Sequence, residues 1–192
     1  MVFLLNDIFL STGSVVTWLF LDYGSRALVV SFCFIAMLPR QLRLVKPHSV
    51  IAACGWAVGM VLTTVIADRL LRQVLPTGGL FAYPVLEGQA LLAIDTVLGI
   101  PLVAVSEELL SRGLFLAWAE RRGWRSGPTI MLSAALFAAF HWSLGPASII
   151  IAAVFGIIAM VSVLLTRSLW PAIGAHWLTD LILFSLPDWL AQ

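Results

Sequence analysis

The chain has 192 residues, of which 61% are hydrophobic and only 11% are charged, and its formal net charge at pH 7 is +1. Soluble domains average roughly 45–50% apolar and about 25% charged residues, so a soluble fold of this length could not bury this much apolar surface. The near-neutral charge, without a basic stripe that interleaves with aromatic residues, argues against a nucleic-acid partner. The composition therefore predicts a protein of the lipid bilayer.

Apolar segments follow one another along the whole chain. Ala147–Thr166 has twenty residues without a charge, which matches the ~20 residues that a helix needs to cross a bilayer. The other candidate spans are Val15–Leu38, Val50–Ala67, Leu91–Trp118, Pro128–Ser143 and Pro171–Leu186. Because we find no internal repeat or linker, we expect one domain over residues 1–192. The sequence thus predicts an all-α, polytopic transmembrane helical bundle of about six spans.

The charges between these segments predict the orientation of the bundle. Basic residues concentrate in alternate connections, whereas the other connections balance them with acids or carry none. Under the positive-inside rule, the basic connections face the cytoplasm and both chain ends face the outside. The basic residues concerned are Arg40, Arg43, Lys46, Arg121, Arg122, Arg125 and Arg167.

Two adjacent glutamates lie inside the third apolar segment. A charged side chain at mid-membrane costs ~2.5–3.5 kcal/mol on insertion scales, so each one needs an explanation. Glu108 and Arg112 are four residues apart, share one helix face and can form a structural ion pair. Glu107 points about 100° away from Glu108 around the helix, so we expect it to lack this partner.

Imidazole and acidic side chains also occur in two later segments, at matching depth. With a rise of ~1.5 Å per residue, Glu107 lies about 18 Å and His141 about 20 Å from the nearest cytoplasmic loop. Asp180 lies ~18 Å deep by the same count, and His176, one turn away on the same face, lies about 12 Å deep. This layering predicts that the four side chains meet in one polar site.

Other unusual residues have simpler interpretations. Asp22 and Arg26 are four apart and can pair within one helix, while Asp95 is a single acid, and no motif converges on any of the three. We expect structural roles for them. Gly55 and Gly59 have the GxxxG spacing that is typical of close helix packing in membranes.

The polar site has the groups that peptide hydrolysis requires. A desolvated, unpaired carboxylate such as Glu107 can act as a general base near neutral pH. His141 could orient the same water or relay its proton, and His176 with a residue one turn later could donate hydrogen bonds to the oxyanion. Two imidazoles and a carboxylate are also an acceptable catalytic zinc set.

Three motifs, in this order along the chain, resemble those of a known family. They are Glu-Glu-x-x-x-Arg at Glu107–Arg112, Phe-x-x-x-His at Phe137–His141, and His-x-x-x-Asp at His176–Asp180. Together they resemble the CPBP family, which comprises CAAX-processing proteases and bacteriocin-processing relatives and is also called the Abi or type II CAAX prenyl endopeptidase family. The resemblance covers about half of the chain and marks residues 91–186 as the catalytic core.

The resemblance implies an intramembrane endopeptidase of the glutamate type that needs no cofactor, although such proteins were long classed as metalloproteases. By this analogy Glu107 and His141 activate a water, His176 and Asp180 form the oxyanion site, and the Glu–Arg pair supports the structure. The family usually has Asn where this chain has Asp180. Because an ionised aspartate would repel an oxyanion, we expect Asp180 to hold His176 in its donor tautomer.

Alternatives remain open at this point. One is a zinc-dependent protease with Glu107, His141 and His176 as ligands, and another is a non-catalytic membrane immunity or scaffold protein. A proton-coupled transporter fits less well, because repeats and broken helices are not evident. The expected partners are membrane lipid and a protein or peptide substrate, such as a prenylated protein or a sorting-signal precursor. The expected location is the plasma membrane of a bacterium or archaeon.

Overall fold

A computed structural model describes residues 15–37, 40–80 and 86–187. Within these ranges all regular elements are helical, which confirms the predicted all-α class. Three elements (η1, η2 and η4) are π-helical turns and η3 is a short 3-10 turn. In chain order the elements are α2 (Val15–Ala36), α3 (Val50–Val74), α4 (Gln89–Ile94), η1 (Asp95–Gly99), α5 (Ile100–Glu108), η2 (Leu109–Leu114), α6 (Phe115–Arg121), α7 (Ser126–Phe140), η3 (Trp142–Leu144), α8 (Pro146–Thr166), α9 (Trp170–Asp180) and η4 (Leu181–Ser185).

Each of the six predicted apolar segments contains a helix in the described part of the chain. In the described part of the chain, four stretches are long and apolar enough to cross a membrane: Val15–Ala36, Val50–Val74, Gln89–Arg121 and Pro146–Thr166. The segment from α4 to α6 forms one continuous helix. Helix α7 is shorter, and α9 is prolonged by η4. The predicted single domain over residues 1–192 includes segments outside the described residues, among them Leu38 at the end of the first predicted span, and stays a prediction.

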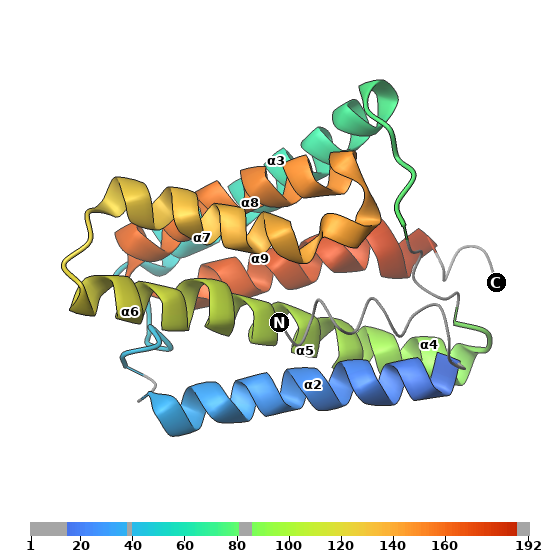
Figure 1. The fold of residues 1–192 in the computed structure, drawn as a ribbon, viewed down its shortest axis with the longest axis horizontal. Coiled ribbons are helices and arrows are strands. Elements are labelled where there is room, and N and C mark those ends of the chain that lie inside the picture. Colours follow the sequence, from blue (N-terminus) through green and yellow to red (C-terminus); the bar gives the residue numbers. More distant parts are fainter. Residues whose placement is uncertain (1–14, 38–39, 81–85, 188–192) are drawn as a thin grey trace.

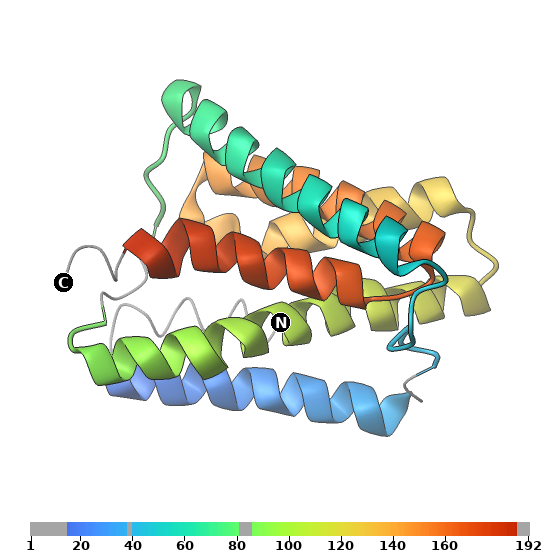
Figure 2. The same ribbon diagram turned by 180° about the vertical axis from the view of Figure 1, so that it is seen from behind.

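Helix α9 lies in the middle of the bundle (Figures 1 and 2). On one side it packs against α5, which is in turn covered by α2. On the other side it contacts α3 and α8, and α7 packs against α8. The side chains of α5 and α9 therefore face each other across the interior of the protein.

Two predicted boundaries were wrong. Helix α3 does not end at Ala67 but continues to Val74, because Asp68 and Arg72 satisfy each other within the helix, with Arg72 Nε 2.6 Å from Asp68 Oδ1. Helix α7 ends at Phe140, so His141 lies just beyond the helix rather than inside it.

The interpretation of the GxxxG spacing was also wrong. Neither Gly55 nor Gly59 has a neighbour within 4 Å of the place that a Cβ would take. Close packing occurs instead between α7 and α8, where a Cβ on Gly156 would lie 2.9 Å from Ala134 Cα. Spacing alone does not reveal which face of a helix meets its neighbour.

We expect Gly156→Ala to lower the free energy of unfolding by about 1–3 kcal/mol relative to Gly55→Ala, because the added methyl group meets backbone. Both variants gain the same helix propensity, so the comparison isolates the packing. Thermal or denaturant unfolding in detergent measures the difference. Equal stability of the two variants would contradict the observed contact between α7 and α8.

Candidate active site

The two glutamates form the end of α5, next to the π-helical turn η2. Glu108 and Arg112 are fully buried, and Arg112 Nη1 lies 2.9 Å from Glu108 Oε1. The guanidinium carbon of Arg112 also lies 4.0 Å from the ring centroid of Phe137, a cation–π contact. The predicted Glu108–Arg112 pair is therefore present, and it joins α5 to α7.

Glu107 is not unpaired, as the sequence had suggested. Arg26 on α2 places Nη1 2.7 Å from Glu107 Oε1. The same guanidinium donates from Nε to both carboxylate oxygens of Asp22, each at 2.9 Å. All three side chains are buried. The expectation was wrong because helix spacing reveals only partners on the same helix, whereas Arg26 comes from another one.

His176 of α9 lies among three carboxylates. Its Nδ1 is 3.0 Å from Glu108 Oε1, and its Nε2 is 3.4 Å from Asp180 Oδ2 and 4.0 Å from Glu107 Oε2. Carboxylates only accept hydrogen bonds, so the imidazolium form is the one with a donor at each ring nitrogen. The expected contact between Asp180 and His176 is present, and Glu108 provides a second, shorter contact.

His141 occupies a turn whose backbone is packed tightly. Its Nδ1 lies 3.0 Å from the carbonyl oxygen of Phe137. Since a carbonyl can only accept, Nδ1 carries the proton and the neutral ring keeps its lone pair on Nε2. The turn closes at Gly145, whose φ is 94°, and a Cβ there would lie 2.7 Å from the carbonyl oxygen of Gly78. Glycine is therefore required where the two backbones meet.

Glu107, His141, His176 and Asp180 all line one cavity of about 320 Å³ between α2, α5 and α9. A volume of this size is at the lower end of the range of small-molecule sites, which are roughly 300–1,000 Å³. The structure thus brings together the four side chains that were predicted to be catalytic. Their roles in a reaction stay predictions.

The cavity also includes residues that sequence reasoning did not place in the site. Asp22, Arg26 and Asp95 line it too, and the hydroxyl of Tyr23 donates to Asp95 Oδ1 at 2.7 Å. The available signal was the unusual presence of charges inside two apolar segments. A charged residue in a membrane span should be regarded as a candidate for the site even when a local partner is available.

Each π-helical turn begins at or directly after an acid that belongs to this site. Asp95 is the first residue of η1, Glu108 precedes η2, and Asp180 precedes η4. Single π-helical turns shift the register of a helix and are frequent at functional sites. These turns therefore help to direct the acids towards the interior of the bundle.

The alternative zinc site would consist of Glu107, His141 and His176. Among the described residues, no group of three or more His, Cys, Asp or Glu side chains is placed to hold a metal ion. Glu107 Oε1 is engaged by Arg26, and His176 Nδ1 faces Glu108 Oε1. The local interactions are those of an ion-pair network.

Fold and cavity define the class of this protein: a polytopic helical membrane protein with buried acids and imidazoles around an internal site. A family model described as type II CAAX prenyl endopeptidase Rce1-like matches residues 89–182. Residues 89–182 therefore belong to this family of CAAX proteases, as the motifs predicted. Membership supports a peptidase that acts on a protein substrate in a membrane. No curated protein and no solved structure matches the chain.

We expect Arg26→Gln to lower the free energy of unfolding by about 3–5 kcal/mol, because it leaves two buried carboxylates without their cation. The matched control is Glu120→Gln, which breaks the ion pair between Arg43 and the exposed Glu120 and should cost less than about 1 kcal/mol. Unfolding in detergent measures both values. Equal effects would show that Arg26 is not buried between acids.

Proposed function

We propose that the chain is an intramembrane endopeptidase that hydrolyses a peptide bond of a membrane-associated protein or peptide with a water activated by Glu107. The observation that supports this most strongly is that the two carboxylate oxygens of Glu107 differ in their contacts. Oε1 is held by Arg26, whereas Oε2 is buried and has no hydrogen-bond partner in the described part of the chain. An oxygen fixed in this way beside the cavity can accept a proton from water.

The charges around Glu107 support its role as a base. Asp22, Arg26 and Glu107 together contain two carboxylates and one guanidinium, so one negative charge is in excess. Uptake of a proton by Glu107 would neutralise this excess charge in a buried place. Arg26 thus orients Glu107 without neutralising the whole group.

In the proposed reaction a water lies between Glu107 Oε2 and His141 Nε2. Glu107 takes one proton, and the resulting hydroxide attacks the carbonyl carbon of the scissile peptide bond. The N–H of His176 stabilises the oxyanion of the tetrahedral intermediate. Asp180 and Glu108 keep His176 in its donor form and orientation. The proton on Glu107 then passes to the leaving amine as the C–N bond breaks.

The matched family indicates which substrate should be tested first. The matched family is described as prenyl endopeptidases, so a prenylated CAAX peptide is the first probe to test. Sorting-signal precursors are the second class. The helices require a membrane, and we propose that this membrane is the plasma membrane of a bacterium or archaeon.

Replacing Glu107 with Gln should reduce cleavage by a factor of roughly 10²–10⁴, the usual contribution of a general base. The assay uses the full chain in liposomes, with a farnesylated CAAX peptide, its unprenylated copy and a proteome-derived peptide library, and detects products by mass spectrometry. Glu120→Gln is the control and should retain activity. Full activity of Glu107→Gln would overturn the mechanism, and no cleavage by the wild-type chain would favour a non-catalytic scaffold or immunity protein.

Removal of metal tests the zinc alternative directly. We expect the chain to retain its activity after dialysis against EDTA, because the proposed water is activated by Glu107 and needs no metal ion. Elemental analysis of the dialysed sample confirms that zinc has been removed. Loss of activity that is restored by zinc alone would contradict the proposed mechanism.

A further inference from the structure

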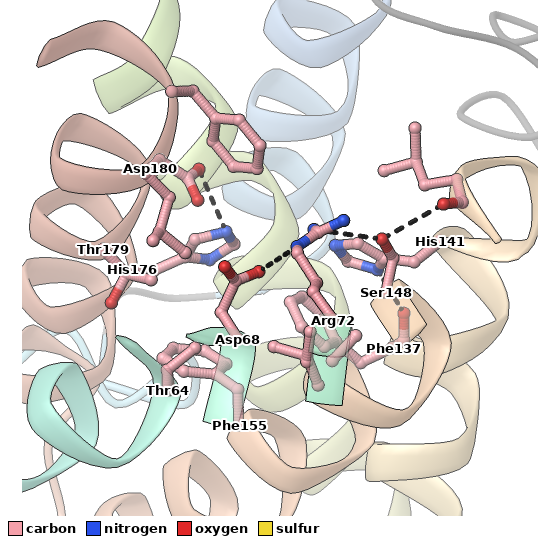
Figure 3. Close-up of a pocket in the computed structure, with 15 residues that line it drawn as sticks. Thr64, Asp68, Arg72, Phe137, His141, Ser148, Phe155, His176, Thr179 and Asp180 are labelled. Atoms are coloured by element: carbon pink, nitrogen blue, oxygen red, sulfur yellow. Dashed lines mark hydrogen bonds and ion pairs between the residues drawn. The ribbon is translucent and has the colours of Figure 1, made fainter. Parts of the chain in front are cut away.

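A second, smaller cavity opens beside the same histidines. It lies between α3, α7, α8 and α9 (Figure 3). Its volume is about 60 Å³. It shares His141, His176 and Asp180 with the larger cavity. Because one water needs roughly 10–15 Å³ by this measure, the small cavity can hold a single chemical group rather than a length of polypeptide.

Arg72 brings an incompletely used guanidinium to this cavity. Its Nε pairs with Asp68 Oδ1, and its Nη2 lies 3.4 Å from Ser148 Oγ, which is long for a hydrogen bond. The side chain of Arg72 is 34% exposed, against 11% for Asp68. A guanidinium has five donors in a planar fork. The fork therefore retains donors that can bind a second carboxylate.

Two threonines add further donors to the cavity wall. Thr64 and Thr179 both line the cavity and are each only 4% exposed. Their hydroxyl oxygens have no hydrogen-bond partner among the residues that the structure describes. Buried polar groups are almost always satisfied, so hydroxyls of this kind indicate a missing partner.

The acids in this cavity are already matched by cations. Asp68 pairs with Arg72, and Asp180 lies beside His176. Among the described residues, Arg72 has donors beyond its contacts with Asp68 and Ser148, and the hydroxyls of Thr64 and Thr179 can donate as well. A surplus of donors around a small volume favours an anionic ligand that is rich in acceptors, and a carboxylate fits the guanidinium fork best.

We propose that the small cavity is a substrate subsite that binds a carboxylate beside His141 and His176. Arg72 is the recognition residue, Asp68 orients it, and Thr64 and Thr179 donate to the bound group. The carboxylate comes from the free C-terminus of the substrate or from an aspartate or glutamate side chain. This inference rests on the proposed peptidase function, although Thr64, Asp68 and Arg72 lie on α3, outside the residues that match the family model.

The test measures binding without turnover. The Glu107→Gln chain in detergent is titrated with fluorescently labelled CAAX peptides that end in an acid or an amide. A second pair, amidated at the end, carries Asp or Asn beside the scissile bond. We expect the acid of one pair to bind roughly 10- to 100-fold more tightly than its neutral copy, as for a charged hydrogen bond. The pair that shows the difference identifies the source of the carboxylate.

Variants on α3 test whether the preference for the acidic peptide depends on Arg72. Adding Arg72→Gln should abolish the preference for the acid, whereas Arg69→Gln, on an exposed position of the same helix, should preserve it. If Arg72→Gln does not fold, the double variant Asp68→Asn/Arg72→Gln removes both charges and should behave in the same way. Equal binding of acid and neutral copies in both pairs, or a preference that survives the loss of Arg72, would overturn the inference.

The outcomes separate this inference from the proposed function. A wild-type chain that cleaves acid and neutral copies equally well supports the peptidase and overturns the subsite. A chain that never cleaves, but shows a preference for the acid that depends on Arg72, supports the subsite and overturns the peptidase.

Discussion

The site depends on one buried ion pair between two helices. Arg26 of α2 holds Glu107 of α5, and Asp22 holds Arg26 from the other side. Inside a bundle each of these charges would be costly alone, so the group is stable only while its members remain together. The pair therefore fixes both the contact between α2 and α5 and the orientation of the carboxylate that faces the cavity.

A second set of contacts connects α5 to α9. His176 lies near Glu107 and Glu108, and Glu108 pairs with Arg112 on the next turn. Ion pairs and hydrogen bonds thus link α2, α5 and α9, each of which contributes a wall of the larger cavity. An arrangement held in place before the substrate binds can stabilise charge without further rearrangement. The same network that maintains the packing therefore prepares the proposed chemistry.

Much of the fold and of the candidate site could be predicted from the sequence, because the features that indicate them lie within single segments. The length of apolar segments predicted the bundle, and charges within them predicted that Glu107, His141 and His176 would meet. The partner of Glu107 could not be predicted in this way, because Arg26 is 81 residues distant. The i,i+4 pairing of Arg26 with Asp22 also gave an explanation for the charge of Arg26 that needed no further partner.

The extent and packing of the helices were predicted less well. Asp68 looked like the end of a span, but its pairing with Arg72 allows the helix to continue. Gly55 and Gly59 had the right spacing for packing, yet the tight contact formed at Gly156. The i,i+4 spacing of Asp68 and Arg72 does reveal their pairing, whereas the contact of Gly156 with another helix cannot be read from the spacing of residues along one segment.

A double-mutant cycle tests the central claim, the direct interaction of Arg26 with Glu107. It compares the free energies of unfolding of the wild type, Arg26→Gln, Glu107→Gln and the double variant. A buried pair in contact should give a coupling energy of at least about 1 kcal/mol. Additive effects, within roughly 0.5 kcal/mol, would show that the two side chains do not interact and would contradict the account.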